Sequence, residues 1–425
     1  MRVLRRDVQL AVTPEQAYSR LYRDSTDSVW LDSGVGATVG MSFVGAGSPG
    51  SGEAFDLLRA SPVADERCAP LGWIGWLGYE LRGRTMGEPT EHASRYPDAG
   101  LLWVERGILF DHTTGSVELI SIAEEGFEQW AAETLAALHV DAVVAPLDPE
   151  PTTASWRYTD AEYLAMVRAC QAAIVEGEAY QLCLTSEASL SIQPDPLAAY
   201  LALRASSPTH HGGLVRIGRV SLLSASPEQF LTVSREGVIE SKPIKGTRPR
   251  GSDSVTDAAL KAELLASDKE RAENLMIVDL MRNDIGRISE VGSVEVPSLL
   301  AIETYPHVHQ LVSTVRGRLA SGLSPVDAVA ACFPAGSMTG APKRRATQLL
   351  AGLEDRARGI YSGAFGYLAA DGSVDLAMVI RSIVLDAEGA TVGSGGGITA
   401  LSVPEEELAE VRLKAAALLR VLGAA

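Results

Sequence analysis

The chain has 425 residues, of which 46% are hydrophobic and 21% charged, a balance typical of a globular protein with a large core. A formal net charge of −17 and the lack of a long basic patch exclude a nucleic-acid-binding surface, and no apolar run approaches the roughly 18 residues of a membrane span. Four widely spaced cysteines, no Cys-x-x-Cys motif and an N-terminus without an apolar signal segment together predict a reduced, cytoplasmic protein.

Short strands and turns dominate the first 125 residues. Thr13-Pro14 predicts the start of a helix, because threonine caps a helix and proline fits its first turn. A further helix is expected in the alanine-rich segment 127–140. The apolar patterns predict strands at 29–34, 72–79, 101–110 and 117–122, the last two joined as a hairpin across residues 113–115.

One segment is a predicted linker. Residues 141–157 contain three prolines and would divide an N-terminal half, residues 1–150, from residues 151–425. The same segment is equally consistent with a surface loop inside one domain.

Two polar side chains follow the linker at the borders of expected strands. A helix from about 160 to 176 precedes a turn and a strand that holds Gln181, for which a surface or edge amide is the simplest reading. Glu228 stands between a proline turn and an apolar strand, in residues 224–231. Desolvation there would raise its pKa and suit it to general acid catalysis, whereas an exposed turn glutamate is the alternative.

A single lysine occupies a short rigid segment. Residues 243–251 read Pro-Ile-Lys-Gly-Thr-Arg-Pro-Arg-Gly, in which the prolines exclude a helix interior and the glycines allow a close approach to a ligand. The 37 basic residues include only six lysines, at positions 242, 245, 261, 269, 343 and 414. Because lysine can become a neutral nucleophile, Lys245 is a candidate nucleophile, and a solvated turn lysine is the alternative.

Two acidic pairs lie on expected helices. Ser267 and Glu270 form a capping-box pattern, and Glu273 lies on the same helix face as Glu270. Near the C-terminus, Glu407 and Glu410 repeat the spacing, and Lys414 follows four residues after Glu410. Capping and ordinary helix-surface ion pairs explain each pair alone, but together they favour an oxygen-ligand site for Mg²⁺.

Glycine-rich segments lie between these acidic pairs, at 333–343, 359–367 and 393–398. Consecutive glycines expose backbone N–H groups to an anion. Arg381 stands in an otherwise apolar strand pattern, which suggests a carboxylate partner.

These segments together resemble the chorismate-utilising enzymes, a family that includes the large subunits of anthranilate synthase and aminodeoxychorismate synthase, and the isochorismate and salicylate synthases. The resemblance is dense from about residue 155 to 420. It is carried by Pro-Ile-Lys-Gly-Thr at 243–247, Ser-Asp-Lys-Glu-Arg-Ala-Glu-Asn at 267–274, Asp-Leu-Met-Arg-Asn-Asp-Ile-Gly-Arg at 279–287, Phe-Pro-Ala-Gly-Ser-Met-Thr-Gly-Ala-Pro-Lys at 333–343 and Gly-Ser-Gly-Gly-Gly-Ile at 393–398. Residues 31–33 and 75–79 resemble the amidotransferase-coupled members.

The resemblance implies an α+β fold with two large antiparallel β-sheets packed face to face and helices outside, of the anthranilate synthase component I type. It further implies that residues 1–150 support the sandwich and its coupling to an amidotransferase. Residues 151–425 would bind chorismate, and both parts would form one intertwined domain.

Roles carried over by position follow the same resemblance. Glu228 would be the general acid for the departing 4-hydroxyl, and Mg²⁺ would hold the ring carboxylate of chorismate among Glu270, Glu273, Glu407 and Glu410. The residues implied to bind substrate are Gln181, Thr247, Gln310, Ser337, Thr339, Tyr361, Arg381, the amides of Gly395 and Gly397, and Lys414.

Two positions separate the branches of the family. Isochorismate and salicylate synthases resemble each other in having a lysine base where this chain has Gln181, which makes ammonia the expected nucleophile here. Anthranilate synthases usually have alanine where this chain has Lys245, and lysine there resembles aminodeoxychorismate synthase. The implied reaction is amination of chorismate to 4-amino-4-deoxychorismate through a covalent Lys245 intermediate, for 4-aminobenzoate and folate synthesis, with ammonia from a separate glutamine amidotransferase subunit.

Other functions stay open at this point. They are an anthranilate synthase large subunit, an aminodeoxychorismate synthase of secondary metabolism and a non-catalytic chorismate-binding regulatory subunit. The sequence also leaves open whether the N-terminal half binds tryptophan. One departure concerns the family histidine before a Leu-Val-Ser-Thr run: this chain has Gln310 there and His309 one residue earlier, and we expect Gln310 to face the site because alternate strand residues face opposite sides.

Overall fold

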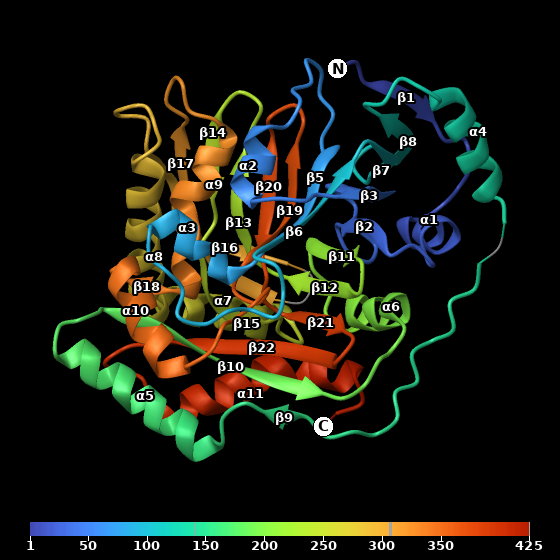
Figure 1. Ribbon diagram of the computed structural model, residues 1–425. Coiled ribbons are helices and arrows are strands. Elements are labelled where there is room, and N and C mark those ends of the chain that lie inside the picture. The colour runs from blue at the N-terminus through green and yellow to red at the C-terminus, as the bar shows by residue number, and fades with distance from the viewer. Residues whose placement is uncertain (141, 306–307, 425) are drawn as a thin grey trace.

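A computed structural model describes residues 1–140, 142–305 and 308–424, so residue 141 at the start of the predicted linker lies outside the described residues. The chain forms two large antiparallel sheets that pack face to face, with helices on the outer faces (Figure 1). This confirms the predicted fold class.

The first sheet has 12 strands in the order β1–β8–β7–β3–β2–β11–β12–β21–β22–β10–β18, with β9 beside β10. The bounds of these strands are β1 (Leu4–Asp7), β2 (Asp27–Asp32), β3 (Met41–Ala46), β7 (Arg106–Asp111), β8 (Ser116–Ser121), β9 (Ser155–Trp156), β10 (Gln181–Leu190), β11 (His211–Ile217), β12 (Val220–Ser226), β18 (Gly340–Ala341), β21 (Ser382–Asp386) and β22 (Gly389–Ile398).

The second sheet has 10 strands: nine in the order β15–β17–β14–β13–β20–β19–β5–β6–β4, and β16, which also pairs with β17. Its strands are β4 (Ser48–Pro49), β5 (Gly72–Leu77), β6 (Ala99–Val104), β13 (Gln229–Val233), β14 (Val238–Ser241), β15 (Ile244–Pro249), β16 (Glu295–Thr304), β17 (Val308–Arg318), β19 (Ala364–Ala369) and β20 (Val374–Met378).

Both sheets combine strands from the two sides of residues 141–157. Strand β2 pairs with β11 in the first sheet, and β5 pairs with β19 in the second. The prediction of a single strand at 101–110 is wrong. Strand β6 ends before Glu105 and belongs to the second sheet, and strand β7 begins after it and belongs to the first. Glu105 and Arg106 interrupt the apolar residues at this point, but a local pattern cannot show to which sheet each strand belongs.

The core between the sheets is built from aromatic rings set against glycines. Phe365 of β19 is 2% exposed, and a Cβ atom on Gly213 of β11 in the opposite sheet would stand 2.7 Å from its ring. Trp76 of β5 covers Gly100 of the neighbouring strand β6 in the same way, with a Cβ there 2.3 Å from the indole. The small residues at these positions let the rings fill the space between the layers.

Helices cover both outer faces (Figure 1). On the first sheet lie α1 (Pro14–Leu21), α4 (Phe127–Ala137), α5 (Asp160–Val175), α6 (Pro196–Ser206), α10 (Lys343–Glu354) and α11 (Pro404–Val421). On the second lie α2 (Ala54–Arg59), α7 (Ser254–Ala266), α8 (Asp268–Gly286) and α9 (Pro325–Cys332). The 3₁₀ turn η1 (Tyr79–Leu81) and α3 (Arg82–Met86) connect β5 to β6, and the 3₁₀ turn η2 (Gly336–Met338) connects α9 to β18.

Threonine side chains cap the first turns of two helices, α1 and α5. Thr13 and Thr159 both accept a hydrogen bond from the third residue of their helices, as the sequence predicts for α1 and α5. Among the described residues, none of the helices is both long and apolar enough to cross a membrane.

We expect Phe365→Ala to lower the free energy of unfolding by about 3–5 kcal/mol, because it removes a ring from the closely packed layer between the sheets. Urea denaturation measures this change. Tyr180→Ala is the matched control: Tyr180 is 71% exposed, and its loss should change stability by less than about 0.5 kcal/mol. Equal effects of the two substitutions would contradict the packing role of Phe365.

Candidate active site

A cavity of about 430 Å³ opens among β15, β22, α8 and α11. All the predicted site residues line it except Gln181 and Thr339. Those that do are Glu228, Lys245, Thr247, Glu270, Glu273, Gln310, Ser337, Tyr361, Arg381, Gly395, Gly397, Glu407, Glu410 and Lys414.

Lys245 lies in β15, beside α8. Asn274 of α8 is fully buried, and its amide donates to the carbonyls of Pro243 and Leu311, each at 3.3 Å, which ties the start of β15 to the helix and to β17. Gly246 follows with φ +82°, and a Cβ atom there would stand 2.7 Å from Leu264 of α7. The backbone on both sides of Lys245 is therefore fixed by burial and by an irregularity in β15 with a left-handed residue, a conformation that favours glycine.

Glu228 occupies the turn between β12 and β13 and is only 9% exposed. Burial raises the pKa of this carboxyl above its ordinary value, and the charge of Lys245 and a hydrogen bond from Ser337 offset part of that effect. A buried carboxyl with a raised pKa stays protonated to a higher pH than an ordinary glutamate, which suits it to general acid catalysis.

The glycine segment of β22 forms a backbone wall. Pairing with β21 ends at Val392, whereas pairing with β10 continues to Ile398, so one edge of residues 393–397 is left open toward the cavity. Gly393 lies against Tyr361, since a Cβ atom there would stand 2.1 Å from the ring.

Two cations stand beside this wall. Lys414 of α11 donates to the carbonyl of Gly395 at 3.0 Å, and Arg381 donates to the carbonyl of Lys414 at 3.5 Å. The expectation that Arg381 lies within a strand is wrong, because it occupies the turn between β20 and β21 with φ +51°. This left-handed conformation is uncommon outside glycine, and such positions are concentrated at functional sites.

The acidic pairs come from two helices that face each other across the cavity. Glu270 and Glu273 lie on α8, and Glu407 and Glu410 on α11. Ser267 caps α8 through the backbone of Glu270, but the reciprocal contact of a capping box is not formed. The Glu270 side chain lies instead at the cavity, with its Oε1 3.7 Å from Arg248.

Basic partners hold three of these carboxylates. Lys414 Nζ lies 2.6 Å from Glu410 Oε1, Lys269 Nζ lies 3.6 Å from Glu407 Oε1, and Arg248 pairs with Glu270. Glu273 has no such partner among the described residues, and burial raises its pKa.

These four carboxylates match the chemistry of Mg²⁺, which takes oxygen ligands. Their spacing does not yet match it: in the part of the chain that the structure describes, no three His, Cys, Asp or Glu side chains lie close enough together to hold a metal ion. Three of the four carboxylates face basic side chains instead.

The remaining predicted residues divide between the cavity and its support. Gln310 of β17 lines the cavity, while His309 bonds to Asp257 of α7 through Nε2 at 3.0 Å and is turned away from it. Thr339 is fully buried and donates to the carbonyls of Ala335 and Gly336, which keeps its hydroxyl from the cavity.

Gln181 is not a surface amide, because it is 1% exposed. It lies behind Gly397, where a Cβ atom would stand 2.1 Å from its Nε2. Its buried Oε1 has no hydrogen-bond partner among the described residues.

Several lining residues were not predicted, among them Cys183, Arg248, Lys269 and Leu413. Arg248 directly follows Thr247 and Lys269 directly precedes Glu270, so the available signal was a basic residue next to a predicted site residue. Cys183 and Leu413 carry no signal, because only the packing of β10 and α11 brings them to the cavity.

Below the cavity, Arg358 joins three chain segments. It is 3% exposed, makes two hydrogen bonds of 2.7 and 2.8 Å to Glu354, and donates to the carbonyls of Met338 and Cys183 at 2.7 and 2.8 Å. Its guanidinium lies 4.4 Å from the centre of the Tyr79 ring. The walls that carry Ser337, Cys183 and Tyr361 are thereby fixed to one buried cation.

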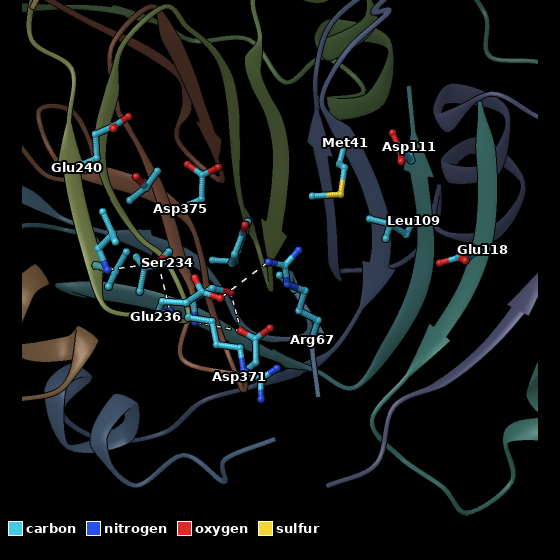
Figure 2. Close-up of a pocket in the computed structure, with 18 of the residues that line it drawn as sticks. Met41, Arg67, Leu109, Asp111, Glu118, Ser234, Glu236, Glu240, Asp371 and Asp375 are labelled. Carbon is cyan, nitrogen blue, oxygen red and sulfur yellow. Dashed lines mark hydrogen bonds and ion pairs between the residues drawn. The ribbon is translucent and has the colours of Figure 1, made fainter. Parts of the chain in front are cut away.

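A larger cavity of about 780 Å³ lies elsewhere between the sheets. Figure 2 shows Arg67, Glu236 and Asp371 gathered at one end of it, with Met41 and Leu109 on the opposite wall. Some of its charges are paired with one another, as in Arg316 with Glu240 at 2.7 Å and Arg5 with Glu118 at 2.6 Å. None of the predicted site residues lines it, so the smaller cavity is the candidate active site.

Comparison with known proteins gives one family, the chorismate binding enzymes, whose model matches residues 33–420. Among curated proteins, the aminodeoxychorismate synthase of Streptomyces griseus is 47% identical over 366 residues, 84% of this chain and 50% of that protein. The corresponding protein of Streptomyces pristinaespiralis is 45% identical over 365 residues, 83% and 51%. The chain thus spans about half the length of these two relatives.

More distant relatives cover a larger share of their own length. Anthranilate synthase component 1 of Methanothermobacter thermautotrophicus is 36% identical over 375 residues, 86% of this chain and 78% of that protein. Among solved structures, anthranilate synthase component I from Streptococcus pneumoniae has a TM-score of 0.78 at 29% identity, over 98% of this chain and 100% of that chain. The menaquinone-specific isochorismate synthase from Escherichia coli has the same fold, with a TM-score of 0.78 at 19% identity over 99% and 94% of the two chains.

We expect Arg358→Met to destabilise the protein by about 3–5 kcal/mol, because it leaves the Glu354 carboxylate buried without its cation. The double variant Arg358→Met/Glu354→Met should be less destabilised than the sum of the two single variants, which urea denaturation of all four proteins measures. Additive effects would show that the two side chains act independently.

Proposed function

This chain belongs to the chorismate binding enzymes, and we propose that it aminates chorismate to 4-amino-4-deoxychorismate. The observation that carries the proposal is the placement of Lys245 and the buried Glu228 in one cavity that also has an open backbone wall and four carboxylates. The high similarity to two aminodeoxychorismate synthases supports the same choice of reaction.

The first half of the proposed reaction attaches the substrate to Lys245. The neutral amine adds to C2 of chorismate, the two ring double bonds shift, and the C4–O bond breaks. Protonated Glu228 gives its proton to the departing hydroxyl, which leaves as water. The carboxylate that remains is stabilised by the secondary ammonium formed on Lys245.

The second half releases the product. Ammonia adds to C4, the double bonds shift back, and the C2–N bond breaks so that Lys245 leaves as a neutral amine. The ammonium at C4 then returns one proton to Glu228. The net reaction consumes chorismate and ammonia and yields 4-amino-4-deoxychorismate and water, with both side chains restored.

Substrate anions would be held at the open wall. In the proposal, Arg381, Lys414, Tyr361 and the amides of Gly395 and Gly397 bind the chorismate carboxylates, while Thr247, Gln310 and Ser337 contact the ring substituents. Gln181 acts from behind Gly397, and Thr339 supports the turn that presents Ser337. Glu270, Glu273, Glu407 and Glu410 would hold Mg²⁺, which supplies positive charge for the ring carboxylate in an otherwise acidic protein.

We propose that a glutamine amidotransferase acting with this chain supplies the ammonia. Free ammonia would replace it in an assay with the purified chain. The product would serve 4-aminobenzoate and folate synthesis. Formation of anthranilate is the second candidate activity, favoured by the similarity to anthranilate synthase component 1.

The test is a product assay with purified protein, chorismate, Mg²⁺ and ammonium at alkaline pH, with products identified by mass spectrometry. We expect 4-amino-4-deoxychorismate in the wild-type protein. We expect Lys245→Ala to lower its rate of formation by about 10³-fold or more, as for the loss of other covalent nucleophiles. The control is Lys261→Ala on α7, an exposed lysine outside the cavity.

The alternative results are distinct. Anthranilate as the product would replace the proposed reaction with that of anthranilate synthase. Isochorismate or salicylate would show that water, not ammonia, is the nucleophile. Full amination by Lys245→Ala would refute the covalent step and keep the rest of the proposal.

Glu228 predicts a pH dependence of kcat/KM for chorismate. Its raised pKa keeps the acid form present above the usual range of a glutamate, so the rate should fall only as the pH rises through that higher pKa. Glu228→Gln should lower the rate by about 10²–10⁴-fold and abolish this alkaline decline, measured at a constant concentration of neutral ammonia. Persistence of the decline in Glu228→Gln would assign it to another group.

A further inference from the structure

Lys269 is a cation at the edge of the acidic cluster that the proposed reaction does not use. It precedes Glu270 on α8, lines the cavity and reaches across it to α11. Its Nζ lies 3.6 Å from Oε1 of Glu407, and its side chain is 51% exposed. Partial burial lowers the pKa of Lys269, but the neighbouring carboxylates raise it by more, those of Glu407, Glu273, Glu410 and Glu270.

Glu407 is the most enclosed of the four carboxylates, with a side chain only 3% exposed. Its Oε1 accepts a hydrogen bond from Ser402 at 2.7 Å, and its Oε2 lies 2.9 Å from where a Cβ atom on Gly396 would stand. A carboxylate this deeply buried requires a positive partner. Lys269 supplies that charge from this chain.

The other two cations of the cluster are held by further contacts. Lys414 also bonds to the carbonyl of Gly395, and Arg248 also pairs with Glu263 at 3.1 Å. For Lys269, the pair with Glu407 is the one ion pair formed within the described residues. Its long stem and half-exposed side chain allow it to move into solvent without any change in the backbone.

We propose that Lys269 is a built-in counter-ion that competes with the divalent cation for Glu407. The inference rests on the proposed function, in which the four glutamates bind Mg²⁺. A cation that approaches Glu407 must displace the ammonium, so the lysine weakens metal binding. It also keeps the buried carboxylate paired when no metal ion is bound, and it thereby acts as a positioning residue for the metal site.

The experiment compares Lys269→Gln with the wild-type protein by calorimetric titration with MgCl₂, without ammonia, in the absence and presence of chorismate. We expect the dissociation constant for Mg²⁺ to fall about fivefold, because the metal ion no longer has to displace an attraction between two unit charges about 4 Å apart in water. Lys269→Arg keeps the charge and should bind Mg²⁺ as the wild type does. Arg271→Gln is the control for charge alone, because Arg271 lies on the same helix turn and does not line the cavity.

Thermal unfolding gives a second readout. Without Mg²⁺, Lys269→Gln should unfold at a lower temperature than Arg271→Gln, because the buried Glu407 carboxylate is left without a positively charged partner. Added MgCl₂ should raise its unfolding temperature by more than that of the wild type, as tighter binding requires.

Other outcomes would overturn the inference. Unchanged or weaker Mg²⁺ binding by Lys269→Gln would show that the lysine does not compete with the metal ion, and an equal gain in Arg271→Gln would reduce the effect to net charge. No Mg²⁺ binding by any of the proteins would remove both the metal site and the inference. Tighter binding by Lys269→Gln in a protein that does not aminate chorismate would overturn the proposed function alone.

Discussion

The buried ion pair between Arg358 and Glu354 is the interaction on which the site depends. A charge in the core must be paired and fully hydrogen-bonded, and Arg358 satisfies this with Glu354 and two backbone carbonyls, those of Met338 and Cys183. Glu354 in turn accepts from the backbone N–H of Thr185 at 2.9 Å. Segments that are far apart in the sequence, β10, the turn at η2 and the loop before β19, therefore meet in one arrangement.

The opposite wall of the cavity consists of charged side chains from two helices. Three of the four acidic side chains of α8 and α11 are paired with Arg248, Lys269 and Lys414, whose own side chains are partly exposed. Because each basic partner reaches solvent, these pairs can exchange partners more easily than the buried pair of Arg358 and Glu354. The cavity thus has one wall fixed by backbone and a buried ion pair, and another wall of charged side chains whose basic partners are partly exposed.

Much of this could be predicted, and the failures have physical causes. The glutamate pairs, Lys245 and the glycine segment of β22 carry their chemistry in residue type and short spacing, and all of them line the cavity. The local pattern at Gln181 favours a surface amide and the resemblance implies a substrate contact, but the side chain is buried behind the cavity wall, because its burial depends on β18 and β22, which are distant in the sequence. Arg381 lies in an apolar run that the chain interrupts with a left-handed turn, and Thr339 bonds to its own backbone turn.

The sequence by itself determined the local features: helix caps at Thr13 and Thr159, the spacing of the acidic pairs, the rigid segment around Lys245 and the motifs of the family. These depend on neighbours within about one helical turn, which the sequence displays directly. Only the tertiary structure decided that β6 and β7 enter different sheets, that His309 turns away while Gln310 lines the cavity, and that Lys269 meets Glu407. Burial and charge pairing depend on residues brought together from distant parts of the chain, and no local pattern records which of them will meet.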